Sequence, residues 1–194
     1  MFATLALDIS DLLILISICF FAGLIRGFSG FGLSAFVMSL ALTIIPPIEL
    51  IPVCWWMEFV ASVFMIKNGW KDSDKKISVI LWLGAIFGLP MGIALTIILD
   101  FQTSKIIALV LILILALILL RNVKIQFLST TVGTIASGVF AGIATGLASI
   151  GGMIVATYVL ASQNSARRMR ASLILYILLN SITTFIFLII FDVM

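Results

Sequence analysis

The sequence predicts an all-α polytopic membrane protein, with about seven to eight transmembrane or half-membrane helices in two inverted repeats, the second incomplete. Three observations lead to this fold class. Hydrophobic residues make up 63% of the 194 residues and charged residues only 10%. The apolar residues gather in long runs with short polar stretches between them. A glycine-rich pattern in the first half of the chain returns 119 residues later in the second half.

This composition excludes several classes of protein. A chain this apolar cannot cover itself with polar surface in water. We therefore expect a multi-pass protein of the cell membrane. The net charge of +3 is small and basic residues flank the apolar runs, so nucleic acid is not an expected partner. The absence of histidine excludes histidine-dependent triads and the HExxH zinc motif. Cys19 and Cys54 are typical packing residues. We therefore expect no enzyme activity, no metal site and no cofactor.

Eight apolar segments form the expected helices. A helix needs about 20 residues to cross the hydrocarbon core. Segment 150–162 is too short and should be a half-helix that stops within protein; its repeat partner, 30–45, should be broken in the same way. Asp8 and Asp11 precede the first segment without a basic residue, so we expect a retained span rather than a signal peptide. The eight segments are 11–26, 30–45, 49–66, 77–98, 105–120, 128–147, 150–162 and 171–191.

Basic residues predict the orientation of these segments. If each segment crosses the membrane once, ten of the eleven lysines and arginines lie on one side and only Lys105 lies on the other. The positive-inside rule makes the first side cytoplasmic. Loops 67–76, 121–124 and 167–170 are then cytoplasmic, and both ends of the chain lie outside the cytoplasm.

The repeated glycines predict an internal duplication. Five segments precede the second copy, and an odd number means that this copy enters the membrane from the opposite side. The repeats are therefore inverted, as in many secondary transporters. We expect 1–194 to form one transmembrane domain, with a first repeat at 11–120 and a partial second repeat at 128–191. The coinciding glycines are Gly23 with Gly142, Gly27 with Gly146, and Gly32 with Gly151.

Glycine-interrupted apolar segments at matching places in two halves point to a transporter's binding site. In 29–32 and 149–152 the glycines lie too close together for helix packing alone. They indicate unwound backbone with free N–H groups before a helix N-terminus, which suits an anion. The candidate substrate-binding residues are Gly27, Ser29, Gly30, Gly32, Ser149, Gly151, Gly152 and Asn180.

Helix packing is the alternative explanation for glycines spaced by four, because small residues let helices approach closely in lipid. Packing is favoured for one set of glycines, whereas for two further sets, which lead into the breaks, packing and function stay open. The first set is Gly84, Gly88 and Gly92. The two further sets are Gly23 with Gly27, and Gly138 with Gly142 and Gly146.

Two charged residues are further candidates, as contacts for a proton or for the substrate. Glu58 lies inside segment 49–66, and a carboxylate at membrane depth costs at least about 2.5 kcal/mol, so it should face the protein interior. A structural hydrogen bond is the alternative. Arg26 either snorkels to the cytoplasmic headgroups as an anchor or lends positive potential to the first glycine break.

Polar residues also lie on equivalent helices of the two repeats. Ser62 follows Glu58 by one helical turn and coincides with Ser181 at the 119-residue offset. Asn180 shares a helical face with Thr184. These side chains either line one cavity or make hydrogen bonds between helices.

Taken together, these motifs resemble the sulfite exporter TauE/SafE permeases over nearly the whole chain. The resemblance lies in Gly27–Gly32 leading into a helix that ends at Pro46-Pro47, in Lys67–Trp70, in Ser149–Ser162, and in Arg167–Arg170 followed by Asn180. It implies a lipid-embedded transporter that moves small anions, particularly sulfite, sulfonates and related organosulfur acids.

The chain departs from the family pattern at two places. Met153-Ile154 stand where related sequences often carry prolines, and family members usually continue for further helices after the point that matches Met194. Two hypotheses follow. The chain is a small-anion permease, in which a second copy as a homo-oligomer completes the bundle, or it is a truncated or partner-dependent membrane component without transport activity of its own.

Overall fold

The computed structural model describes residues 8–121, 130–161 and 165–193, and in these residues the chain forms eight helices and no strand. Loop residues 122–124, positions 128–129 of the sixth predicted segment and position 162 of the seventh lie outside the described residues. The helices are α1 (Ile9–Ser29), α2 (Leu33–Ala41), α3 (Pro47–Gly69), α4 (Lys75–Ile98), α5 (Phe101–Leu120), α6 (Thr131–Ala148), α7 (Gly151–Ala161) and α8 (Ala166–Ile190).

Six of these helices, α1, α3, α4, α5, α6 and α8, are long and apolar enough to cross a membrane. The predicted all-α polytopic membrane fold is therefore confirmed. The two remaining helices are short, with nine residues in α2 and 11 in α7. Both short helices follow a glycine break, as the sequence predicts for half-helices.

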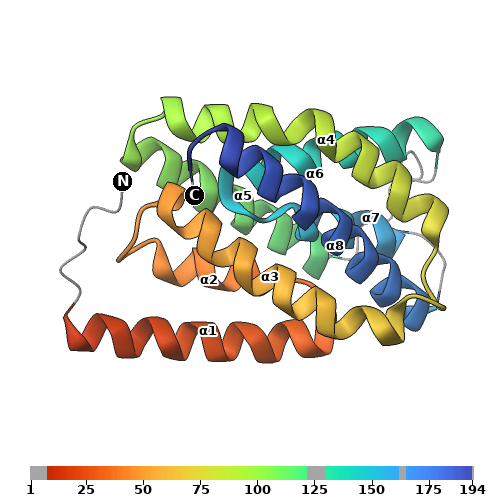
Figure 1. Ribbon diagram of the computed structural model, residues 1–194, viewed down its shortest axis with the longest axis horizontal. Helices are drawn as coiled ribbons and strands as arrows, with labels where there is room; N and C mark the ends of the chain where they lie inside the picture. The colour runs from red at the N-terminus through yellow and green to blue at the C-terminus, as the bar shows by residue number, and fades with distance from the viewer. Residues whose placement is uncertain (1–7, 122–129, 162–164, 194) are drawn as a thin grey trace.

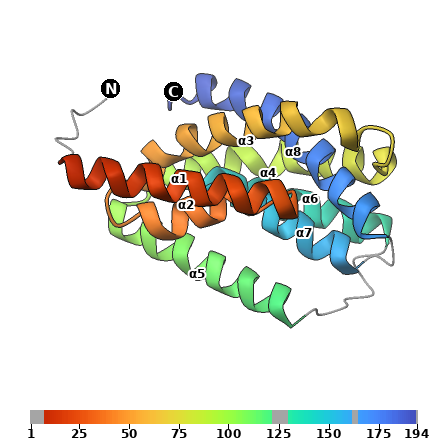
Figure 2. The ribbon, with the colours of Figure 1, turned by 90° about the horizontal axis from the view of Figure 1, so that it is seen from below.

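Successive helices run in alternating directions along the bundle, so α1 begins and α8 ends at the same end (Figure 1). The helix that opens the second glycine pattern, α6, runs opposite to α1 in both views (Figures 1 and 2). This is the relation that an inverted repeat requires, although the repeat boundaries 11–120 and 128–191 stay predictions. Helices α1 and α5 carry many exposed apolar side chains, as expected of helices that face lipid.

The two glycine breaks share one backbone feature. Helix α1 ends at Gly30, whose φ of 80° is left-handed and whose N–H bonds the carbonyl of Arg26 at 2.9 Å. Helix α6 ends at Ser149, which is also left-handed at φ 57° and bonds the carbonyl of Thr145 at 2.7 Å. These residues stand 119 positions apart, so equivalent positions of the glycine pattern stop their helices in the same way.

Helices α4 and α6 form the most closely packed pair, and glycines on both make the approach possible. A Cβ at Gly84 would lie 2.6 Å from the carbonyl oxygen of Ile135, and one at Gly142 would lie 2.8 Å from the nitrogen of Leu89. Packing is thus confirmed for the first glycine set, and it also decides the open alternative for Gly138, Gly142 and Gly146. By contrast, a Cβ at Gly23 or Gly27 would meet nothing within 4 Å.

Two helices begin four or five residues earlier than the hydrophobic pattern predicts. Helix α5 starts at Phe101 because Asp100 caps it, accepting a hydrogen bond from the Thr103 nitrogen at 3.0 Å. Helix α8 starts at Ala166, where Ser165 is the N-cap. The arginines at 167–170, which the sequence places in a loop, therefore lie in the first turns of α8.

Candidate functional site

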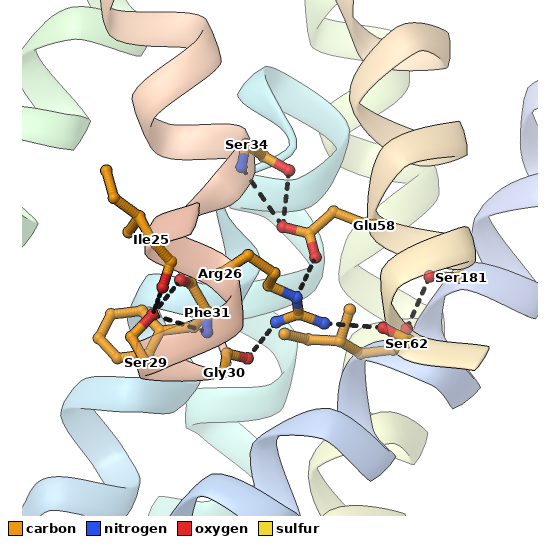
Figure 3. Close-up of polar contacts among 10 residues, drawn as sticks. Ile25, Arg26, Ser29, Gly30, Phe31, Ser34, Glu58, Ser62 and Ser181 are labelled. Carbon is orange, nitrogen blue, oxygen red and sulfur yellow. Dashed lines mark hydrogen bonds and ion pairs between the residues drawn. The ribbon is translucent and has the colours of Figure 1, made fainter. Parts of the chain in front are cut away.

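A buried ion pair joins the last turn of α1 to the middle of α3, next to the first glycine break (Figure 3). Arg26, in the last turn of α1, is 0% exposed. Its Nε lies 3.2 Å from Oε2 of Glu58 on α3. Its Nη2 donates to Oγ of Ser62 at 2.7 Å, and its Nη1 donates to the carbonyl oxygen of Gly30. The guanidinium group is thus held by α3 on one side and by the break on the other.

This arrangement decides between the two interpretations of Arg26. The side chain does not reach the headgroups, so the snorkelling alternative is wrong. The physical reason lies in α3, which places Glu58 and Ser62 one turn apart on the face toward α1. A buried charge is tolerated when an opposite charge and hydrogen bonds compensate its lost hydration. The contact of Arg26 with the Gly30 carbonyl agrees with the alternative of positive potential at the first break.

Glu58 also caps the half-helix that follows the first break. Its Oε1 accepts hydrogen bonds from the Ser34 nitrogen at 3.3 Å and from Ser34 Oγ at 2.9 Å. Ser34 lies in the first turn of α2, where N–H groups lack helical partners and the helix dipole favours negative charge. The N-terminus of α2 therefore already holds an anion, the carboxylate of Glu58 (Figure 3).

The second break borders a small cavity of about 30 Å³ between α3, α6, α7 and α8. Six of the residues named from the sequence line it, namely Glu58, Ser149, Gly152, Asn180, Ser181 and Thr184. Asn180 is 7% exposed, and its Oδ1 has no hydrogen-bond partner in the described part of the chain. Its Nδ2 lies 3.4 Å from Oγ1 of Thr145. The cavity thus combines an incompletely bonded amide with the N-terminus of α7.

The other predicted residues lie outside the cavity wall. The hydroxyl of Ser29 bonds its own backbone, at 2.8 Å from the carbonyl oxygen of Ile25. Arg170 of α8 covers the first break, because its Nη2 donates to the Gly27 carbonyl and its Cγ would lie 2.8 Å from a Cβ at Gly30. Gly32 is left-handed at φ 88° and precedes α2.

Gly151 packs instead of facing the cavity, since a Cβ there would overlap Oγ1 of Thr145 and the Ala141 carbonyl. The two breaks therefore meet the cavity differently. The second break touches it directly, through Ser149 and Gly152. The first break is connected to it through Arg26 and Glu58.

Several cavity residues were not among the candidates. Thr145 stands 119 residues after Arg26, so the repeat itself could have identified it. Tyr176 precedes Asn180 by one helical turn, and this spacing also carries a signal. Trp55 lines the wall and donates its Nε1 to the carbonyl of Ser181 at 2.7 Å. Nothing in the pattern indicated that this tryptophan lies at the cavity.

Hollows lie at both ends of the bundle. One, of about 390 Å³, lies between the end of α3 and the start of α8 and is lined by Arg167 and Arg170 among others. Beside it, Arg167 pairs with Asp72 at 2.6 Å and Arg168 pairs with Asp74 at 3.1 Å. The other, of about 670 Å³, lies at the opposite end of the bundle and is mostly apolar, with the acidic Glu49 and Asp192 in its wall.

Comparisons with known proteins agree with this architecture. No curated protein and no solved structure matches the chain. The family model described as "Sulfite exporter TauE/SafE" matches residues 15–194, which is nearly the whole chain. Its apolar helices and this match identify a multi-pass membrane protein of a transporter family. The chain belongs to the sulfite exporter TauE/SafE family.

Proposed function

We propose that the protein is a permease of the cell membrane for a small sulfur oxyanion, namely sulfite, a sulfonate or a related organosulfur acid. The observation that carries this proposal is a cavity at the N-terminus of α7 whose wall holds the amide of Asn180 and the hydroxyl of Ser149. Membership of the family supports the class of cargo. That a second copy of the chain completes the bundle stays a prediction.

The cavity wall offers the hydrogen-bond donors that an oxyanion needs. The Asn180 amide carries two N–H groups, of which one is directed to Thr145. The hydroxyl of Ser149 makes no hydrogen bond to another described residue and lies on the wall. The first N–H groups of α7 and its helix dipole add to these donors. No lysine or arginine is among the described residues that line the cavity, so an anion there would be held by hydrogen bonds and could be released.

The first break supports this assignment from within the same molecule. At the N-terminus of α2 an oxyanion, the Glu58 carboxylate, accepts hydrogen bonds from Ser34. The N-terminus of α7 follows the equivalent break, and there Ile177 stands at the position that matches Glu58 at the 119-residue offset. The second half-helix therefore lacks the internal carboxylate of the first, which leaves its N-terminus for an external anion.

Size and charge suggest how cargo moves. The cavity, of about 30 Å³, is small, so we expect its walls to move apart before a sulfur oxyanion can pass. The hollow lined by Arg167 and Arg170 lies at the expected cytoplasmic end, and its positive charge raises the local concentration of anions.

Replacing Asn180 with alanine should weaken sulfite transport. Losing a hydrogen bond to a charged group costs about 1.5–3 kcal/mol. This cost raises the half-saturating concentration by roughly 10- to 100-fold. The measurement is counterflow of labelled sulfite in liposomes that contain the purified protein. Thr183→Val is the matched control, because Thr183 lies on the same helix but accepts a hydrogen bond from Trp82 instead of lining the cavity.

The wild-type result tests the class of function, and the variants test the site. Counterflow above that of protein-free liposomes is expected for the wild type and for Thr183→Val. If the wild type shows none, the alternative of a component without transport activity is correct. If Asn180→Ala has the same half-saturating concentration as Thr183→Val, the cavity is not the anion site.

A further inference from the structure

We propose that Glu58 couples proton binding to anion binding, so that one proton accompanies each monovalent anion through the protein. This inference rests on the proposed function and names the coupling ion. Among the described residues that line the cavity, Glu58 carries the single carboxyl group. Its two oxygens are bound on the other side, by Arg26 and by Ser34.

The charges of this assembly argue for coupling. With Glu58 ionised, Arg26 and Glu58 form a neutral pair beside the cavity. An anion that enters would add an uncompensated negative charge next to a carboxylate, in a region of low dielectric constant where like charges repel strongly. If Glu58 is protonated, the positive charge of Arg26 is compensated by the entering anion instead. The unloaded assembly is neutral because Arg26 and the ionised Glu58 cancel. The loaded assembly is neutral only if a proton on Glu58 accompanies the anion.

No other described group at the cavity is as well suited to carry the proton as Glu58. Among the described residues, the charged or titratable groups that act on Glu58 or its partner are Arg26 of α1, Cys54 of α3 and Arg170 of α8, and Tyr176 of α8 also lines the cavity. The arginines are always protonated, and the buried thiol and phenol do not face Arg26 as an ionic partner. The neighbouring helices α2, α6 and α7 contribute Ser34, Thr145, Ser149 and Gly152, none of which titrates.

The cycle needs no covalent step. A proton from one side adds to the Glu58 carboxylate and gives a carboxylic acid, while the guanidinium of Arg26 keeps its charge. The anion then binds at Asn180 and the N-terminus of α7. After the cavity opens to the other side, the anion leaves and the carboxylic acid returns its proton to water, which restores the Arg26–Glu58 pair.

The test compares two transport modes of the same liposomes. Counterflow at equal pH reports anion exchange, whereas accumulation driven by an alkaline interior reports coupling to protons. A difference of one pH unit drives at most about tenfold accumulation if one proton moves with each anion. Glu58→Gln mimics the protonated acid permanently. With a labelled sulfonate, which takes up no proton of its own, we expect counterflow at a changed half-saturating concentration and no accumulation, so that the anion only equilibrates across the membrane.

Controls separate this idea from the chemistry of sulfite itself. Sulfite itself takes up a proton near neutral pH and would accumulate in an alkaline interior without coupling, so accumulation is measured with a sulfonate, which stays ionised. Glu49→Gln, which changes the other glutamate, lies on the same helix at its outer end and should accumulate the sulfonate like the wild type. Protein-free liposomes give the background.

Each outcome decides the matter. Accumulation by Glu58→Gln equal to that of the wild type would overturn the inference while leaving the proposed function intact, because counterflow persists. Absence of pH-driven accumulation by a wild type that shows counterflow would overturn it as well. Should Glu58→Gln fail to fold, proton uptake by the wild type during sulfonate entry, followed with a pH indicator, replaces it: one proton for each anion is expected, and none would overturn the inference.

Discussion

Valine in place of Gly142 should prevent the normal assembly of α4 against α6. A Cβ at this position would lie 2.8 Å from the Leu89 nitrogen and 2.9 Å from the Ala85 Cα, and would overlap the Ala85 carbonyl oxygen. These are backbone atoms of a neighbouring helix, which cannot rotate away as a side chain can. The helices must separate, and overpacking of this kind exceeds the usual cost of about 1–3 kcal/mol. We expect a large loss of thermal stability in detergent, or no monodisperse protein.

The repeat supplies the matched control for this variant. Gly23 stands 119 residues before Gly142, and a Cβ there would meet nothing within 4 Å. Gly23→Val should therefore melt close to the wild-type temperature, measured by tryptophan fluorescence during heating. If Gly142→Val and Gly23→Val melt at the same temperature, the glycines between α4 and α6 are not needed for close packing.

Arg26→Gln should be the most destabilising change at the site. It leaves the carboxylate of Glu58 buried without its positive partner, and breaking a buried ion pair from one side costs about 3–5 kcal/mol. It also removes the donors to Ser62 and to the Gly30 carbonyl. The measurement is the shift of the thermal unfolding midpoint in detergent relative to the wild type.

A second substitution should recover most of this loss. In Arg26→Gln/Glu58→Gln no unpaired charge is buried, and replacing both members of a buried pair is often nearly neutral. Arg167→Gln is the control, because Arg167 also pairs with a carboxylate but is 83% exposed, where an ion pair contributes about 0–1 kcal/mol. A double variant no more stable than Arg26→Gln would show that the charge balance of the pair is not what stabilises this region.

Much of the fold follows from local properties of the sequence. Long apolar runs predict the six spanning helices, and short runs after glycines predict α2 and α7 as half-helices. The starts of α5 and α8 were harder to predict, since the polar residues after Asp100 and the arginines after Ser165 are typical of loops. They become helical because a capping side chain satisfies the first N–H groups. Such caps outweigh the local hydrophobic pattern.

The site was predictable only where one helix determines it. The pattern alone indicates that Glu58 and Ser62 share a face, and that Asn180 lies in an apolar helix. That Arg26 pairs with Glu58 depends on how α1 packs against α3. That Gly151 packs while Gly152 lines a cavity depends on how α7 meets α6. Sequence spacing carries no direct information on such contacts between helices.

The position of a bound oxyanion can be observed with selenite, the selenium analogue of sulfite. Anomalous diffraction from crystals grown with selenite would locate the selenium atom without relying on the shape of the density. We predict a peak between Asn180 and the N-terminus of α7, with its oxygens within hydrogen-bonding distance of the Asn180 amide, and no such peak in Asn180→Ala. Selenium bound only at the exposed Arg167 and Arg168, in a protein that still exchanges sulfite, would contradict the assignment of the cavity as the anion site.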